Sequence, residues 1–147
     1  MNRKFLAAAV VATFVAVGCS SVNRESGPTG LGAQLAGTWT SFQTGSLQDS
    51  CTNFTWTVTQ FTGSTGAGTF SATCFGNVQV AGTASGTLTS PTTINWSVTA
   101  GASGPGIPVP CPLTLSGTAV IEGDLIRIPY TGSWCQGPLS GLELVRR

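Results

Sequence analysis

From residue 36 onward, hydrophobic and polar residues alternate with a period of two. In FTWTVTQF, Phe54, Trp56 and Val58 share one face, and the threonines between them share the other. INWSVTA repeats this pattern around Trp96. Strict alternation of β-branched and aromatic residues with polar ones is typical of half-buried strands. The pattern predicts eight strands, separated by turn sequences such as GSTG, SPTT and EGD, at about residues 36–43, 53–61, 67–74, 77–89, 93–100, 112–121, 125–133 and 139–146.

Matching patterns in neighbouring strands predict how they pair. In AVIEGDLIRI, a two-residue turn at Gly123-Asp124 would set Ile121 opposite Ile126 and Leu113 opposite Trp134. All apolar side chains then fall on one face, and Gly117 leaves room for a ring.

In the next hairpin we expect Arg127 opposite Glu143 on the outer face, with Ile128 against Leu142 and Ile126 against Leu144. A slip of one residue would reverse every face.

Eight antiparallel strands with short links predict an all-β fold, an eight-stranded antiparallel up-and-down β-barrel, which leaves no exposed sheet edge. A two-sheet β-sandwich is the alternative. A membrane-spanning barrel is not expected, because its threonine and serine face would have to contact lipid.

The first eighteen residues have the organisation of a secretory signal. Arg3 and Lys4 precede an apolar run from Phe5 to Val17, broken only by Thr13. This run is shorter than the roughly 20 apolar residues that span a bilayer.

The run ends in Ala16-Val17-Gly18-Cys19, which resembles the lipobox of bacterial lipoproteins. The resemblance implies that Cys19 carries a diacylglyceryl group, that the signal is cut before it, and that the new N-terminus receives a fatty acyl chain such as palmitate. Such a cysteine anchors the protein to a membrane. Ser20, where the family's inner-membrane retention signal has Asp, implies the outer membrane of a Gram-negative-type bacterium. An ordinary signal peptide with a chance cysteine is the alternative.

The chain therefore divides into a signal peptide (1–18), a lipidated cysteine with a flexible tether rich in Gly, Ser and Pro (19–34), and a barrel domain (35–147).

Four further cysteines, an even number in an exported chain, predict two disulfides. Four cysteines allow three pairings, and the strand pattern favours one of them. Cys51 and Cys74 flank the FTGSTG turn, and Cys111 and Cys135 flank the Gly123-Asp124 turn. We therefore expect Cys51–Cys74 and Cys111–Cys135. Each pair misses the face-matching register by one residue, so each requires a bulge or a frayed strand end.

Charged side chains are sparse, and this restricts the chemistry. The chain has no histidine, and Asp49 is the only charged residue between Glu25 and Glu122. A general acid–base pair needs positioned titratable groups. We therefore expect no enzyme, no metal site and no cofactor. With no basic patch to hold nucleic acid, we expect none as partner, and we expect a monomer.

Gly37-Thr38-Trp39 in the first strand is similar to the Gly-any-Trp of the calycin superfamily, the lipocalins and avidin-like proteins. The resemblance implies that Trp39 lies near the closed end of the barrel under a late arginine, here Arg146 or Arg147, in a cation–π contact. With one tyrosine, Tyr130, and no inward acid expected, no biotin-binding residues are transferred.

The first strand starts at the tether, so the opposite, distal end holds the links at 44–52, 75–77, 101–110 and 132–138. In calycins this set of links surrounds the open mouth. We expect a small apolar ligand there, with polar groups from Gln48, Asp49 and Gln136. The candidate ligand-binding residues are Trp56, Trp96, Trp134, Tyr130, Ile107 and Val109.

The alternative is a barrel filled by its own side chains, which docks a protein partner of the envelope through the same loops as an interaction or structural protein or as an enzyme inhibitor.

Overall fold

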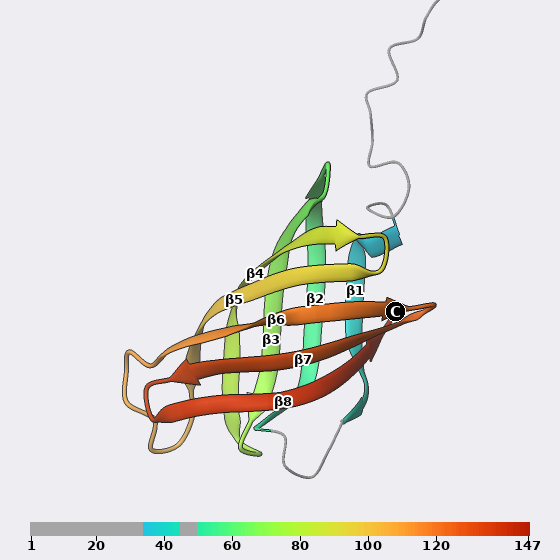
Figure 1. The fold of residues 1–147 in the computed structure, drawn as a ribbon. Helices are drawn as coiled ribbons and strands as arrows, with labels where there is room; N and C mark the ends of the chain where they lie inside the picture. Colours follow the sequence, from blue (N-terminus) through green and yellow to red (C-terminus); the bar gives the residue numbers. More distant parts are fainter. Residues whose placement is uncertain (1–33, 45–49) are drawn as a thin grey trace, which may run out of the picture.

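The computed structural model describes residues 34–44 and 50–147 and shows a closed antiparallel barrel of eight strands (Figure 1). The strands follow one another around the ring in sequence order, so the up-and-down barrel is confirmed and the sandwich is not formed. Within the described residues, no helix has the length and apolarity to cross a membrane. The strands are β1 (Gly37–Thr44), β2 (Cys51–Thr62), β3 (Thr65–Cys74), β4 (Val78–Ser90), β5 (Thr93–Ser103), β6 (Pro112–Glu122), β7 (Leu125–Trp134) and β8 (Gly137–Arg146).

The barrel has two distinct ends (Figure 1). At the entry end, the chain joins β1, and the β2–β3, β4–β5 and β6–β7 turns lie at this same end, as does the C-terminus. At the far end lie the links β1–β2, β3–β4, β5–β6 and β7–β8. Both disulfides belong to the far end, because all four cysteines lie at or beyond the far ends of their strands.

The two predicted disulfides, Cys51–Cys74 and Cys111–Cys135, are both present. Cys51 lies directly opposite Cys74, because the β2–β3 register shifts between Thr52 and Thr55. Asn53, within this bulge, adopts a left-handed backbone conformation with φ of 53°. The second bridge joins residues just outside β6 and β7, so its strand ends are frayed. The expected one-residue mismatch in register is therefore relieved by a bulge at Cys51–Cys74 and by the ends of the strands at Cys111–Cys135.

The β6–β7 hairpin has the predicted register. Ile121 pairs with Ile126, and Leu113 pairs with Trp134 at the other end of the hairpin. The Gly123-Asp124 turn thus aligns the apolar faces of the two strands.

The β7–β8 hairpin differs from the prediction by one residue. Ile128, not Arg127, stands opposite Glu143, and Leu142 and Leu144 face Pro129 and Arg127. The cause is the turn, because Trp134 pairs with Gly137 and leaves only two residues, 135 and 136, in the link. A two-residue link is a preferred hairpin connection.

This register turns Glu143 into the barrel, where its side chain is 0% exposed. The expectations of an outward Glu143 and of a barrel without an inward acid are therefore wrong. Leu139 and Val145, on the same face of β8, are 2% and 1% exposed, so the register that the turn sets also buries apolar residues of β8. The carboxylate of Glu122 takes the place of Glu143 beside Arg127, with Oε1 at 3.2 Å from Nε.

The outer face carries hydroxyl groups in cross-strand rows. Thr57, Thr69, Thr83, Thr99 and Thr114 pair in succession from β2 to β6. Threonine pairs of this kind stabilise neighbouring strands and keep the surface polar without charge.

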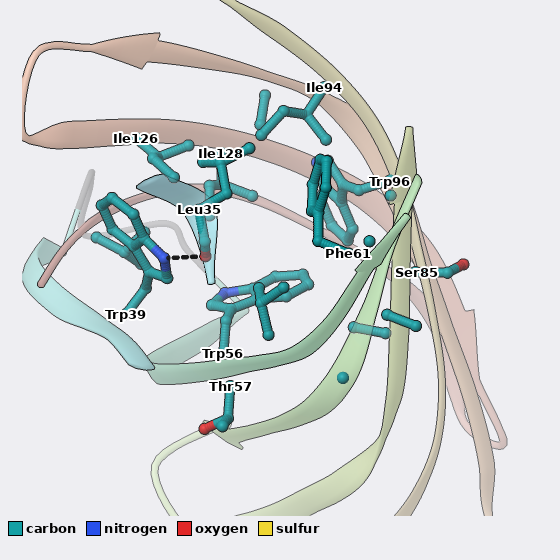
Figure 2. Close-up of a pocket in the computed structure, with 18 of the residues that line it drawn as sticks. Leu35, Trp39, Trp56, Thr57, Phe61, Ser85, Ile94, Trp96, Ile126 and Ile128 are labelled. Carbon is teal, nitrogen blue, oxygen red and sulfur yellow. Dashed lines mark hydrogen bonds between the residues drawn. The ribbon is translucent and has the colours of Figure 1, made fainter. Parts of the chain in front are cut away.

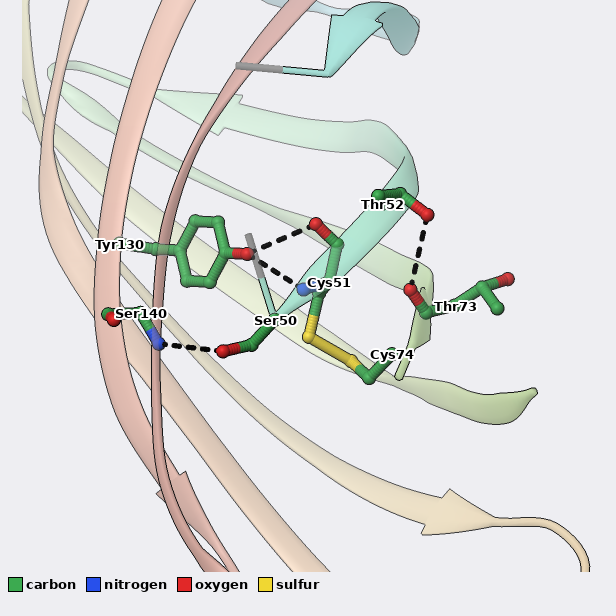
Figure 3. Close-up of a disulfide and its surroundings, with 7 residues drawn as sticks. All are labelled: Ser50, Cys51, Thr52, Thr73, Cys74, Tyr130 and Ser140. Atoms are coloured by element: carbon green, nitrogen blue, oxygen red, sulfur yellow. Dashed lines mark hydrogen bonds between the residues drawn. A yellow bond between two sulfur atoms is a disulfide. The ribbon is translucent and has the colours of Figure 1, made fainter. Parts of the chain in front are cut away.

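In the far half of the interior, the hydroxyl of Tyr130 points at Cys51 (Figure 3). Its hydroxyl donates to the carbonyl oxygen of Cys51 at 3.0 Å and accepts from the Cys51 N–H at 2.9 Å. Its ring lies 5.2 Å from that of Phe54, centroid to centroid. Tyr130 therefore ties β7 to the start of β2, next to the first disulfide.

Replacing Tyr130 with phenylalanine should lower the free energy of unfolding by about 1–3 kcal/mol, because a buried backbone N–H and a buried carbonyl at Cys51 lose their partner. Ser116→Ala, which removes an exposed hydroxyl from β6, should change stability by less than about 0.5 kcal/mol. Denaturant unfolding of both variants measures the difference. Equal stability of the two variants would contradict the role given to the Tyr130 hydroxyl.

Candidate functional site

The interior at the entry end contains an apolar cavity of about 90 Å³ (Figure 2). Its wall is almost wholly hydrophobic and comes from all eight strands together with Leu35, just before β1. The residues that line it are Leu35, Trp39, Trp56, Thr57, Val58, Phe61, Gly66, Ala67, Gly68, Thr69, Ala84, Ser85, Gly86, Ile94, Trp96, Ala119, Ile126, Ile128 and Val145.

Three tryptophans surround this space. Trp39 and Trp56 are direct neighbours across β1 and β2. The rings of Trp56 and Trp96 meet edge to face, with centroids 5.0 Å apart and planes at 84°. Edge-to-face contact is a favoured geometry for aromatic pairs. All three side chains are less than 10% exposed, so their rings form the cavity wall rather than the outer surface.

Trp96 fits because its neighbours on both sides are glycines. Gly86 on β4 and Gly117 on β6 stand directly opposite Trp96. A Cβ atom at Gly117 would clash with the carbonyl oxygen of Pro129 and lie 3.2 Å from Cζ2 of Trp96. The expected room for a ring beside Gly117 is therefore occupied by Trp96.

Leu35 and Arg147, from the two ends of the domain, both lie beside Trp39 at the entry end. The side chain of Leu35 is 6% exposed, and its carbonyl oxygen accepts a hydrogen bond from Nε1 of Trp39 at 2.9 Å. Cζ of Arg147 lies 5.5 Å from the Trp39 ring centre, which confirms the predicted cation–π contact and assigns it to Arg147. Arg146 instead lies 4.0 Å above the ring of Phe42.

Two of the indole N–H groups at the cavity have no hydrogen-bond partner among the described residues. Nε1 of Trp56 and Nε1 of Trp96 are both buried, and neither donates to any protein atom. A buried donor left unsatisfied costs about 1–3 kcal/mol. The cavity thus combines an apolar wall with two unused donors.

The six candidate ligand-binding residues divide between the two ends of the barrel. Trp56 and Trp96 line the cavity. Trp134 stacks on the exposed ring of Phe75 at 5.0 Å, and Tyr130 is buried against Cys51. Ile107 packs partly on the core, and Val109 is 88% exposed.

The far end, where we expected the ligand, is packed around Phe54, Leu113 and Tyr130, and the apolar cavity lies at the opposite end. Gln48 and Asp49 lie outside the described residues, and Gln136 lies in the turn between β7 and β8. A binding role for the six residues stays a prediction.

Several lining residues were not singled out from the sequence, among them Leu35, Ile94 and Ala119. The cross-strand pairing of Trp96 with Gly86 and Gly117 is the signal that could have located the site, because a large ring between two glycines marks uneven filling of a small barrel.

The size of the cavity restricts what it can hold. An engineered apolar cavity of about 150 Å³ binds benzene. A space of about 90 Å³ therefore suits a compact group such as a five-membered ring or the end of a chain.

Introducing a methyl group through Gly117→Ala should lower the free energy of unfolding by about 1–3 kcal/mol, because the methyl group would crowd the backbone at Pro129 and displace Trp96. Gly101→Ala is the matched control, since a Cβ there meets nothing within 4 Å. Thermal and denaturant unfolding of the two variants check this. Equal loss in both would show that the space at Gly117 is not needed for the Trp96 ring.

Comparison with protein-family models gives no match for this chain, and comparison with curated proteins gives none.

Proposed function

We propose that the protein is an outer-membrane lipoprotein whose barrel binds a small apolar molecule at its entry end. The observation that carries this proposal is the apolar cavity with three tryptophans around it. Small-molecule sites are typically concave and mostly apolar, with few polar groups. An eight-stranded barrel can hold one small ligand when its own side chains leave space.

The chain enters the barrel at the same end as the cavity. Cys19 is outside the described residues, but the chain reaches the barrel at residue 34, at the entry end (Figure 1). Lipidation of Cys19 would therefore attach the membrane to the end that contains the cavity. Apolar molecules concentrate in the bilayer, so the membrane is the natural source of the ligand in this proposal.

The second candidate is a barrel that docks an envelope protein through its far end. Phe75 is 52% exposed and stacks on Trp134, and Val109 is 88% exposed in the β5–β6 link at the same end of the barrel. Exposed apolar side chains that lie together mark interaction surfaces. In this candidate the cavity is a packing defect, and the loops carry the function.

Metabolic labelling with a fatty acid tests the anchor. The wild-type chain should incorporate the label, Cys19→Ser should lose it, and Ser21→Ala should keep it, because only Cys19 supplies the thiol of the proposed lipobox. Mass spectrometry of the N-terminal peptide gives the acyl content directly. An unlabelled wild-type protein would remove the lipoprotein part of the proposal.

A cavity-filling variant tests ligand binding. Cyclopentane should raise the melting temperature of the wild-type chain, because a ligand that binds only the folded state stabilises it. Ala119→Leu should abolish this rise by placing three further carbon atoms in the cavity. Ala81→Leu, the same change on the outer face, should leave the rise intact.

Native mass spectrometry of the protein as isolated completes the test. A co-purified small molecule would support the binding barrel. No thermal shift together with a bare polypeptide mass would overturn it and favour the docking candidate.

A further inference from the structure

We infer that the ligand of the entry-end cavity is an apolar molecule with a neutral hydrogen-bond acceptor, such as a ketone, ester, ether or alcohol oxygen, which receives the indole N–H of Trp56 or Trp96. This inference rests on the proposed function and specifies its ligand class. The geometry points to it because the two buried polar side-chain atoms of the lining that have no partner among the described residues are both donors.

No described residue accepts a hydrogen bond from the indole N–H of Trp56 or Trp96. Trp39 provides the contrast, since its indole N–H donates a hydrogen bond to the Leu35 carbonyl oxygen at 2.9 Å. Figure 2 shows the nitrogen side of Trp56 turned toward Trp39 and Leu35, rather than toward the Trp96 ring. Trp56 is 9% exposed and Trp96 is 7% exposed, so bulk water has little access to either indole N–H.

Water is a poor permanent partner in this cavity. A buried water molecule is held by about two to four polar groups and needs acceptors for its own hydrogens. The three side-chain hydroxyls of the lining, those of Thr57, Thr69 and Ser85, belong to the outer face. There the hydroxyl of Thr57 lies 3.2 Å from that of Thr38, and the hydroxyl of Ser85 lies 3.2 Å from that of Ser97. An acceptor on an apolar ligand satisfies the donors without leaving hydrogens of its own unpaired.

The acceptor should be uncharged. Every side chain in the cavity wall is neutral. An anion buried there would lose its hydration without a compensating positive charge, and that loss is larger than the gain from one or two N–H groups. Arg147 stacks over Trp39 at the end of the barrel and is not one of the lining residues.

A matched pair of probes tests the inference. Cyclopentanone and methylenecyclopentane have nearly the same shape, but only the ketone carries an acceptor. Their dissociation constants for the full chain are measured by calorimetry, and each is corrected by the compound's partition between water and alkane. The ketone should then bind at least about tenfold more tightly than the alkene.

Variants locate the donor. Trp56→Phe and Trp96→Phe, made singly and together, should reduce this preference, and the double variant should bring it to within about twofold of unity. Trp134→Phe is the control, because Trp134 stacks on Phe75 at the far end and does not line the cavity, and it should leave the preference unchanged. In the wild-type chain, ketone should shift the indole N–H resonance of Trp56 or Trp96, and the alkene should shift neither.

Each outcome has a definite meaning. Equal corrected affinities of ketone and alkene would overturn the acceptor and leave the binding barrel standing. Tighter binding of cyclopentanecarboxylate than of the ketone would overturn the neutral assignment. Binding of none of the probes would overturn both this inference and the proposed function.

Discussion

A ring of eight strands closes only if the last strand meets the first with matching faces, so the pairing of β8 with β1 constrains every residue between them. Here β8 presents Leu139 and Val145 to the interior, and Glu143 is carried inward with them. The β1–β8 ladder shifts register between Ser41 and Gln43, and Phe42 is 47% exposed there, so one bulge absorbs the remaining mismatch. Closure of the barrel therefore leaves the Glu143 carboxyl buried and the Phe42 ring exposed, while the rest of the interior is continuously apolar.

That interior is filled unevenly along its length. A chain of ring contacts runs from Tyr130 through Phe54 and Phe70 to Trp56 and Trp96, with successive centroids 4.7–5.3 Å apart. In the far half, large side chains meet large side chains and leave little space. At the entry end, the last rings of this series, Trp56 and Trp96, face small residues such as Ala84, Gly86 and Ala119. The cavity is therefore a consequence of where small residues follow large ones, rather than of a wider barrel.

Alternation predicted the strands, the β6–β7 register and both disulfides, because each depends on residues close together in the chain. The register of β8 could not be predicted in the same way. Its sequence LSGLELVR has apolar residues at both parities, and the apparent match of Arg127 with Glu143 favoured the wrong one. Which end of the barrel holds the cavity depends on residues that are neighbours across three adjacent strands, such as Gly86, Trp96 and Gly117. These neighbours can be identified only once every register is known.

Leu35 has a mechanical consequence through its place in the chain. Leu35 lies two residues before β1; its carbonyl accepts a hydrogen bond from Trp39, and its side chain lines the cavity inside the barrel end. A pulling force applied from the N-terminal side would act on Leu35 before it acts on the hydrogen bonds that pair β1 with β2 and β8. A single turn of backbone would yield before a strand does, so force on the N-terminus would uncover the Trp39 ring while the sheet stays whole.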